Sequence, residues 1–328
     1  VCKECSKLGK IQKAPPKPKF VQQKNKQQKN KPKRNYSRND EPSEELIEDF
    51  DFAIRKARES RDWSREVLGK KINERVSVIT RIETGKMTPD RKLTKKLEKA
   101  FYRQFCDQIV EIVKQVTITS EEMASHLIVE NIDIVEKLRS ENRSIVYYLG
   151  HIGCWEYVAY FAEASKTNDL YIGYKKLTNE TFDKLMYNLR AKFGGHPVQD
   201  VKLLRTLAQL KKEGKRAELG FLADQSPMPD ALNYWTTFLN QNTAMIDSIE
   251  RIARKLDYAV CYFDVTRQQR GVYKIKIQLI TDDIASTPQN YVTEEYTRLL
   301  EQTVKKQPEC FLWSHNRWKY TPADYTRK

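Results

Sequence analysis

A histidine and a glutamate stand five positions apart in the segment YYLGHIGCWEYVAYF, within and just after a short apolar run. A neutral imidazole can take a proton from a hydroxyl group, and a nearby carboxylate can orient the ring and stabilise the imidazolium. These two residues, His151 and Glu156, supply half of an apparatus for acyl transfer without a protein nucleophile. The same spacing also arises by chance, so two structural residues are the alternative.

Cys154 lies between these two residues and is the rival nucleophile, because a thiolate can attack an acyl group directly. No base stands beside it in the sequence, so we expect it to be inert. Cys2 and Cys5 have the spacing of one zinc-binding pair, but a structural zinc needs four ligands and this pair is half a site. We therefore expect no metal and no resident cofactor. The other cysteines are isolated, as in reduced cytosolic proteins.

Two later blocks place polar side chains where they could meet a substrate. GFLADQSP ends a predicted strand with Asp224 and Gln225, and open α/β sheets build their active sites at such ends. FLWSHNRWK brings three basic side chains close to two tryptophans, namely His315, Arg317 and Lys319. Aromatic rings beside cations suit an anionic head group at a membrane surface, and a solvated terminal segment is the equal alternative.

The elements that must position these residues are strands that alternate with helices from residue 101 onward. Strand patterns cover RSIVYYLGH, DLYIGY, AELGFLA, YAVCYFDV and VYKIKIQLI, and helical patterns separate most of them. This alternation predicts an α/β layered domain over residues 101–328, with a mainly parallel sheet and an antiparallel hairpin at its edge. Among the helices, we expect 101–116, 120–139 and 243–256.

Residues 46–100 have a different pattern, which is typical of a small all-α domain. The stretch SREVLGKKINERVSVITRIETG reads as two short helices joined by a tight turn, with Gly85 as a C-cap. We expect a helix-turn-helix whose exposed side chains meet a nucleic-acid groove, namely Arg65, Arg75, Ser77, Thr80 and Arg81. A plain helical bundle with solvated charges fits the same composition.

Residues 1–45 are rich in Lys, Gln, Asn and Pro, and they carry most of the net charge of +15. Such a segment can bury too little apolar surface to become ordered, so we expect a disordered basic linker. A basic tail attracts nucleic acid or an anionic lipid surface. A solubilising arm without a partner is the alternative.

The first hundred residues resemble the archaeal multiprotein bridging factors, through VCKECSKLGK, the lysine-rich linker and EDFDFAIRKARESRDWSREVLGKKI. RIETGK is also similar to the Cro/repressor type of helix-turn-helix. The resemblance implies a zinc ribbon and a DNA- or ribosomal RNA-binding domain, in a transcription coactivator or a factor of the small ribosomal subunit. This chain departs from the pattern because it lacks the first cysteine pair of the ribbon.

Residues 101–328 resemble the lipid A late acyltransferases of the lysophospholipid acyltransferase superfamily. The shared features are a His-x4-acid motif, an ADQ block and a Trp-x-His-x-Arg-Trp-Lys block, in that order. The resemblance implies transfer of a fatty acyl chain from an acyl carrier protein or coenzyme A thioester to a lipid hydroxyl. Carried over by position, it implies that His151 is the general base and Glu156 its partner. It also implies that Asn179 and Arg190 bind phosphate or shape the acceptor site.

We therefore expect an O-acyltransferase acting on a lipid A precursor or a related lipid, fused to a nucleic-acid-binding module. The alternative is a bridging factor that carries the second domain as an inactive passenger. No run of about 18 apolar residues is present, so no bilayer span is expected. We expect a cytoplasmic protein at the periphery of the inner membrane.

Overall fold

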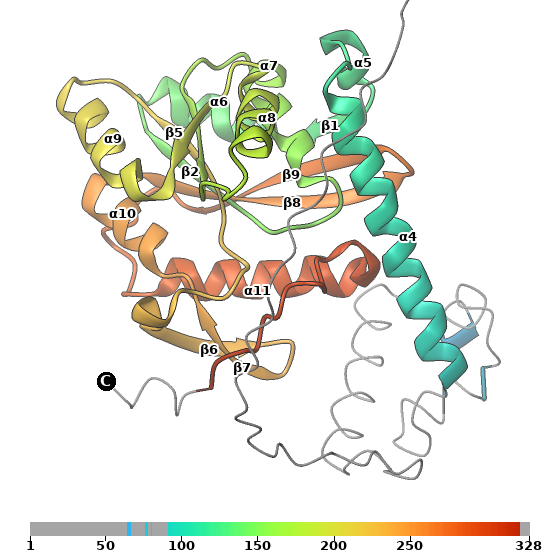
Figure 1. Ribbon diagram of the computed structural model, residues 1–328. Coiled ribbons are helices and arrows are strands. Elements are labelled where there is room, and N and C mark those ends of the chain that lie inside the picture. Colours follow the sequence, from blue (N-terminus) through green and yellow to red (C-terminus); the bar gives the residue numbers. More distant parts are fainter. Residues whose placement is uncertain (1–63, 67–75, 78–79, 81–90, 322–328) are drawn as a thin grey trace, which may run out of the picture. The chain divides into compact units, whose positions relative to one another are not determined.

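Seven strands form one mixed sheet in the computed structural model, which describes residues 64–66, 76–77, 80 and 91–321 (Figure 1). Their order is β1-β9-β8-β2-β5-β3-β4. The strands are β1 (Leu127–Glu130), β2 (Ile145–Leu149), β3 (Leu170–Tyr174), β4 (His196–Gln199), β5 (Glu218–Leu222), β8 (Ala259–Gln269) and β9 (Val272–Thr281). Neighbours are parallel except β8 and β9. The prediction of an α/β domain with a mainly parallel sheet is confirmed. The hairpin lies one strand inside the edge, because β1 pairs with the outer side of β9.

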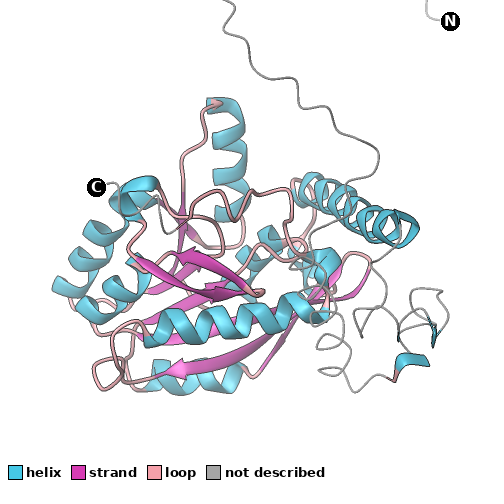
Figure 2. Cartoon of the chain, turned by 90° about the horizontal axis from the view of Figure 1, so that it is seen from below, coloured by secondary structure: helices cyan, strands magenta, loops and turns pink. Residues whose placement is uncertain are grey.

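Both faces of the central strand β2 are covered, which explains its uninterrupted apolar sequence. Tyr147 stacks on Phe263 and meets Phe161 of α7 edge-on, whereas Tyr148 packs against Tyr296 of α11. Successive side chains of a strand point to opposite faces, so α7 and α11 lie on opposite sides of the sheet. Figures 1 and 2 show α11 across one face, and Figure 1 shows α6, α7 and α8 above the other.

The helices of this domain are α4 (Arg91–Gln115), α5 (Ser120–Ala124), α6 (Ile132–Ser140), α7 (Phe161–Ala164), α8 (Glu180–Ala191), α9 (Asp200–Lys212), α10 (Ser248–Leu256) and α11 (Tyr291–Lys306). Three short 3-10 helices are η1 (Trp155–Tyr160), η2 (Pro229–Ala231) and η3 (Pro308–Cys310). The predicted domain boundary at residue 100 falls inside α4, which is continuous. No helix among the described residues is long and apolar enough to cross a bilayer.

Two predicted helices are wrong in part. The segment 120–139 is divided by β1, because Leu-Ile-Val pairs with β9 and Asn131 then adopts a positive φ of 61° before α6 begins. The segment 243–256 begins as strand β7 (Gln241–Met245), which pairs with β6 (Tyr234–Phe238) in a separate hairpin. Leu239 and Asn240 both have positive φ, as a two-residue hairpin turn requires. The helix begins only at Ser248.

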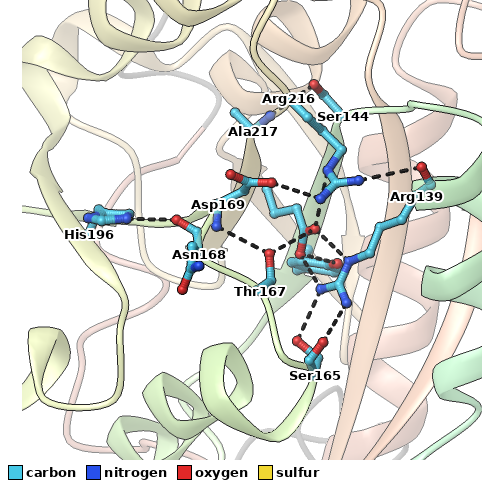
Figure 3. Close-up of polar contacts among 11 residues, drawn as sticks. Arg139, Ser144, Ser165, Thr167, Asn168, Asp169, His196, Arg216 and Ala217 are labelled. Atoms are coloured by element: carbon cyan, nitrogen blue, oxygen red, sulfur yellow. Dashed lines mark hydrogen bonds and ion pairs between the residues drawn. The ribbon is translucent and has the colours of Figure 1, made fainter.

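A buried ion pair joins α6 to the start of β5. Glu218 is fully buried, and Arg139 donates to its two oxygens through Nε and Nη2, each at 2.7 Å. Tyr147 also donates to Glu218, at 2.9 Å. Arg139 further reaches the carbonyl and hydroxyl of Ser165, which follows α7 (Figure 3). These bonds fix α6, α7, β2 and β5 to one another near the N-terminal ends of β2 and β5.

Most of the predicted N-terminal features lie outside the described residues. These are the cysteine pair Cys2 and Cys5, the basic linker, and Arg75 and Arg81 of the predicted helix-turn-helix. Arg65, Ser77 and Thr80 are described and are helical. The Thr80 hydroxyl donates to the carbonyl of Val76, one turn earlier in the chain, at 2.9 Å.

Candidate active site

His151 and Asp224 meet where the neighbouring parallel strands β2 and β5 end. Leu149 and Leu222 are register partners, so the residues that follow each strand emerge side by side. His151 Nδ1 lies 2.6 Å from Asp224 Oδ1, and Asp224 is only 2% exposed. Burial alone would raise the pKa of this carboxyl, but the charge and hydrogen bonds of His151 outweigh burial and lower it. Asp224 therefore stays ionised and holds the Nδ1–H tautomer of His151.

The other ring nitrogen of His151 faces a side-chain amide. Gln225 Nε2 lies 3.3 Å from His151 Nε2 and donates to it in this tautomer. Trp155 stands edge-on to the imidazole, with the ring centroids 4.7 Å apart. The imidazole is therefore held by a carboxylate on one nitrogen, an amide on the other and an aromatic ring beside it.

Glu156 does not serve as the carboxylate of His151, contrary to the prediction from the sequence. Its two oxygens accept from Arg190, which donates through Nη2 at 2.6 Å and Nε at 2.9 Å. Trp155 Nε1 donates to the same carboxylate at 3.2 Å. The physical reason is η1, the 3-10 helix that starts at Trp155 and turns Glu156 toward α8. The pair supports the wall of the site.

The loop between β2 and η1 is held tightly from two sides. Gly153 has a φ of +55°, and a Cβ there would lie 2.2 Å from the ring of Tyr273, so only glycine fits. Gly153 N donates to Cys310 O at 2.8 Å, and Leu312 N donates to His151 O at 3.2 Å. The segment after α11 therefore fixes the backbone that carries His151.

Cys154 is buried under this loop. Burial raises the pKa of its thiol well above the usual value, and the nearby carboxylates of Glu111 and Glu156 add to the rise. A thiol in this state stays protonated at neutral pH. The geometry gives Cys154 the character of a packing residue.

A pocket of about 400 Å³ opens beside His151, on the α7 and α8 side of the sheet. Ligand pockets commonly measure roughly 300–1,000 Å³. Its lining is mainly apolar and includes Leu149, Phe161, Ile172, Gly220 and Phe263. Its polar lining includes Glu156, Lys175, Arg190 and Gln225. A long apolar group can therefore occupy the pocket while its polar end lies at His151.

The C-terminal block acts on the site indirectly. His315 Nε2 accepts from Ser226 N at 3.0 Å, and Ser226 Oγ donates to Arg317 O at 2.6 Å. Arg317 is buried and donates to Ala244 O at 2.6 Å; burial lowers its pKa to about 10, against the opposing charge of Asp224. These contacts clamp the loop that follows Gln225. Lys319 is exposed and lies over the ring of Tyr320.

Of the predicted substrate-binding residues, the structure brings Arg190 and Gln225 to the pocket. Asn179 is exposed and caps α8, with its side chain accepting from Phe182 N. Asp224 lies beneath His151. The sequence predicted Asp224 as a substrate-binding residue and did not predict its contact with His151, although both residues stand at the ends of predicted strands and that placement was the available signal. Among the described residues, no group of three or more His, Cys, Asp or Glu is placed to hold a metal.

Residues 68–320 match the family model of the bacterial lipid A biosynthesis acyltransferases. The match covers about three quarters of the chain and begins within the segment predicted as a helix-turn-helix domain. A comparison with curated proteins finds no match.

Proposed function

The chain belongs to the bacterial lipid A biosynthesis acyltransferase family, and on that premise we propose that it moves a fatty acyl chain from a thioester to a lipid hydroxyl. The observation that carries the proposal is the His151–Asp224 pair at the mouth of an apolar pocket. The donor is an acyl carrier protein or coenzyme A thioester. The acceptor is a lipid A precursor or a related lipid.

The proposed reaction uses His151 as a general base. His151 Nε2 takes the hydroxyl proton as the acceptor oxygen attacks the thioester carbonyl carbon. The tetrahedral intermediate then expels the thiolate, which receives the same proton from His151. Asp224 stays ionised throughout and stabilises the imidazolium, as the buried carboxylate does in a Ser-His-Asp triad. No covalent enzyme intermediate forms.

Arg190 and Glu156 are assigned to the shape of the site. Their bidentate pair joins α8 to η1 across the pocket, and Arg190 also lies over the ring of Tyr174. Lys175, at the end of β3 beside the pocket, supplies an exposed cation that suits a phosphate of the donor or of the acceptor head group.

The test is an assay with a labelled acyl thioester and a lipid acceptor in detergent. His151→Ala should lose about 10²–10⁴-fold in kcat, the usual contribution of a general base, with an unchanged melting temperature. Cys154→Ser is the matched control and should retain most activity. An active His151→Ala enzyme, or an inactive but folded Cys154→Ser enzyme, would refute the mechanism.

A further inference from the structure

Helix α4 buries polar side chains and exposes apolar ones, the reverse of an ordinary surface helix. The fully buried side chains among its described residues are polar and lie on one side of the helix: Gln104, Asp107, Gln108, Glu111 and Gln115. The opposite side carries exposed apolar residues, which we call the outer face: Tyr102, Ile109, Val110 and Val113. A helix of a globular domain normally turns its apolar stripe inward. Here the stripe points away from the domain.

Specific hydrogen bonds fix this orientation. Tyr273 OH accepts from Gln104 Nε2 at 3.0 Å and donates to Glu111 Oε2 at 2.8 Å. Asp107 accepts from Arg267 and Arg270 near the turn of the β8–β9 hairpin, beside which Figure 1 shows α4. Rotating the helix to bury the outer face would break all these bonds. The outer face is therefore a stable feature of the fold.

The charges beside the outer face are mostly positive. Lys99, Arg103 and Lys114 are exposed and follow one border of the apolar stripe, on the side of Val110. Lysine and arginine can lay their stems along apolar surface while their charged ends meet phosphate groups. A second copy of this helix would offer these cations little complement, because Glu98 is the one exposed acid among the described side chains of α4. Anionic lipid complements both the apolar and the basic residues.

We propose that the outer face of α4 docks on an anionic lipid bilayer. An apolar face of this kind, bordered by cations, lies at the boundary between head groups and acyl chains. The last residue of α4, Gln115, donates to the Glu156 carbonyl at 3.1 Å, so docking also brings the His151 loop near the surface. The significance of that loop for acyl transfer rests on the proposed function, whereas the binding of α4 to a bilayer does not.

The test measures co-flotation of the full chain with phosphatidylcholine vesicles, with and without phosphatidylglycerol. Parent protein should bind the anionic vesicles preferentially. Val110→Asp with Val113→Asp should weaken binding about tenfold or more, since each change puts a charge into the apolar contact. The control is Val201→Asp on α9, where the valine is 85% exposed, and it should bind like the parent. His151→Ala should also bind normally, whether or not it disables transfer.

Three outcomes would overturn the proposal. If the double variant binds as tightly as the parent, the attachment lies elsewhere, for example in the basic tail. If the parent is a dimer by light scattering and the double variant is a monomer, a second copy covers the face. If the parent ignores vesicles and the double variant melts at a lower temperature, another segment of this chain covers it.

Discussion

Asp224 and Glu156 are the two buried carboxylates closest to the proposed chemistry, and their surroundings give them different roles. Asp224 contacts the imidazole, and Glu156 contacts a guanidinium. The sequence favoured Glu156, because it is the carboxylate nearest to His151 along the chain and both residues closely follow a predicted strand. The loop after β2 is irregular, and it ends in a 3-10 helix. The motif therefore pointed to a histidine that lines the pocket, and the carboxylate beside that histidine comes from the end of the neighbouring strand.

Replacing each carboxylate by its amide separates the two roles. Asp224→Asn should lower kcat by about 10²-fold or more, because the amide no longer holds the Nδ1–H tautomer or stabilises the imidazolium. Glu156→Gln should instead lower the melting temperature and raise KM, since Arg190 loses its charged partner at the pocket wall. Steady-state kinetics and thermal melts on both variants make the comparison. The reverse pattern would return the catalytic role to Glu156.

Gly220 on β5 offers a way to change the length of the pocket. A Cβ at this position has only the Tyr171 carbonyl oxygen within 4 Å, at 3.9 Å, so the backbone there accepts a side chain without a clash at Cβ. Gly220 lines the pocket. Gly220→Val should therefore reduce kcat/KM about tenfold or more for the longest accepted acyl thioester, and much less for short ones. A uniform loss across chain lengths would mean that the acyl chain lies elsewhere.

At the scale of elements, the loop after β5 depends on the C-terminal block. His315 accepts a hydrogen bond from Ser226 N, which requires an unprotonated Nε2. Burial lowers the pKa of His315, and the charges of Arg317, Lys319 and His151 lower it further against the opposing effect of Asp224. The unfolded chain therefore binds more protons than the folded one below the ordinary histidine pKa. Stability contributed by this neutral imidazole is present at neutral pH and decreases on acidification.

His315→Gln tests this dependence, because a glutamine oxygen can accept the same hydrogen bond and does not titrate. Between about pH 7.5 and about pH 5.5, the melting temperature of the variant should fall less than that of the parent. Differential scanning fluorimetry in matched buffers measures both. An equal fall in the two proteins would assign the acid sensitivity to other groups.

Elements with a clear apolar pattern could be predicted from the sequence, and those that depend on distant partners could not. β2, β3, β5, β8, β9 and α11 follow directly from their apolar patterns. β1 and β4 have four residues each and owe their strand conformation to β9 and β3, which are distant in sequence or reached through a helix. The β6–β7 hairpin depends on positive φ values at Leu239 and Asn240. The residue types at these two positions do not by themselves predict such values. The inverted burial of α4 likewise follows from Tyr273 and Arg267, its distant partners.

At the scale of the whole molecule, the pair of Arg139 and Glu218 is a buried charge contact that joins α6 to the central sheet. Arg139→Met leaves Glu218 buried without its bidentate partner and should cost about 3–5 kcal/mol of unfolding free energy. Adding Glu218→Leu should recover most of this loss, because the buried carboxylate, which would keep only the more distant Arg216 as a cationic partner, is removed. Urea unfolding of the single and double variants measures both steps. Two equal and additive losses would show that the ion pair itself is not the source.

The Glu218 carboxylate also bears on the register in which β5 pairs with its neighbours. Glu218 is the first residue of β5, and Asp224 lies six residues after Glu218, just beyond the end of the strand. At about 3.3 Å per extended residue, the two residues are roughly 20 Å apart. A strand that paired one residue out of register would turn Glu218 away from Arg139 and would shift Asp224 away from His151 at the same time. Misregistered molecules are thus both unstable and inactive. A change in stability of this kind is enough for chaperones and proteases to act on, so selection for a stable β5 register also selects for the contact between Asp224 and His151.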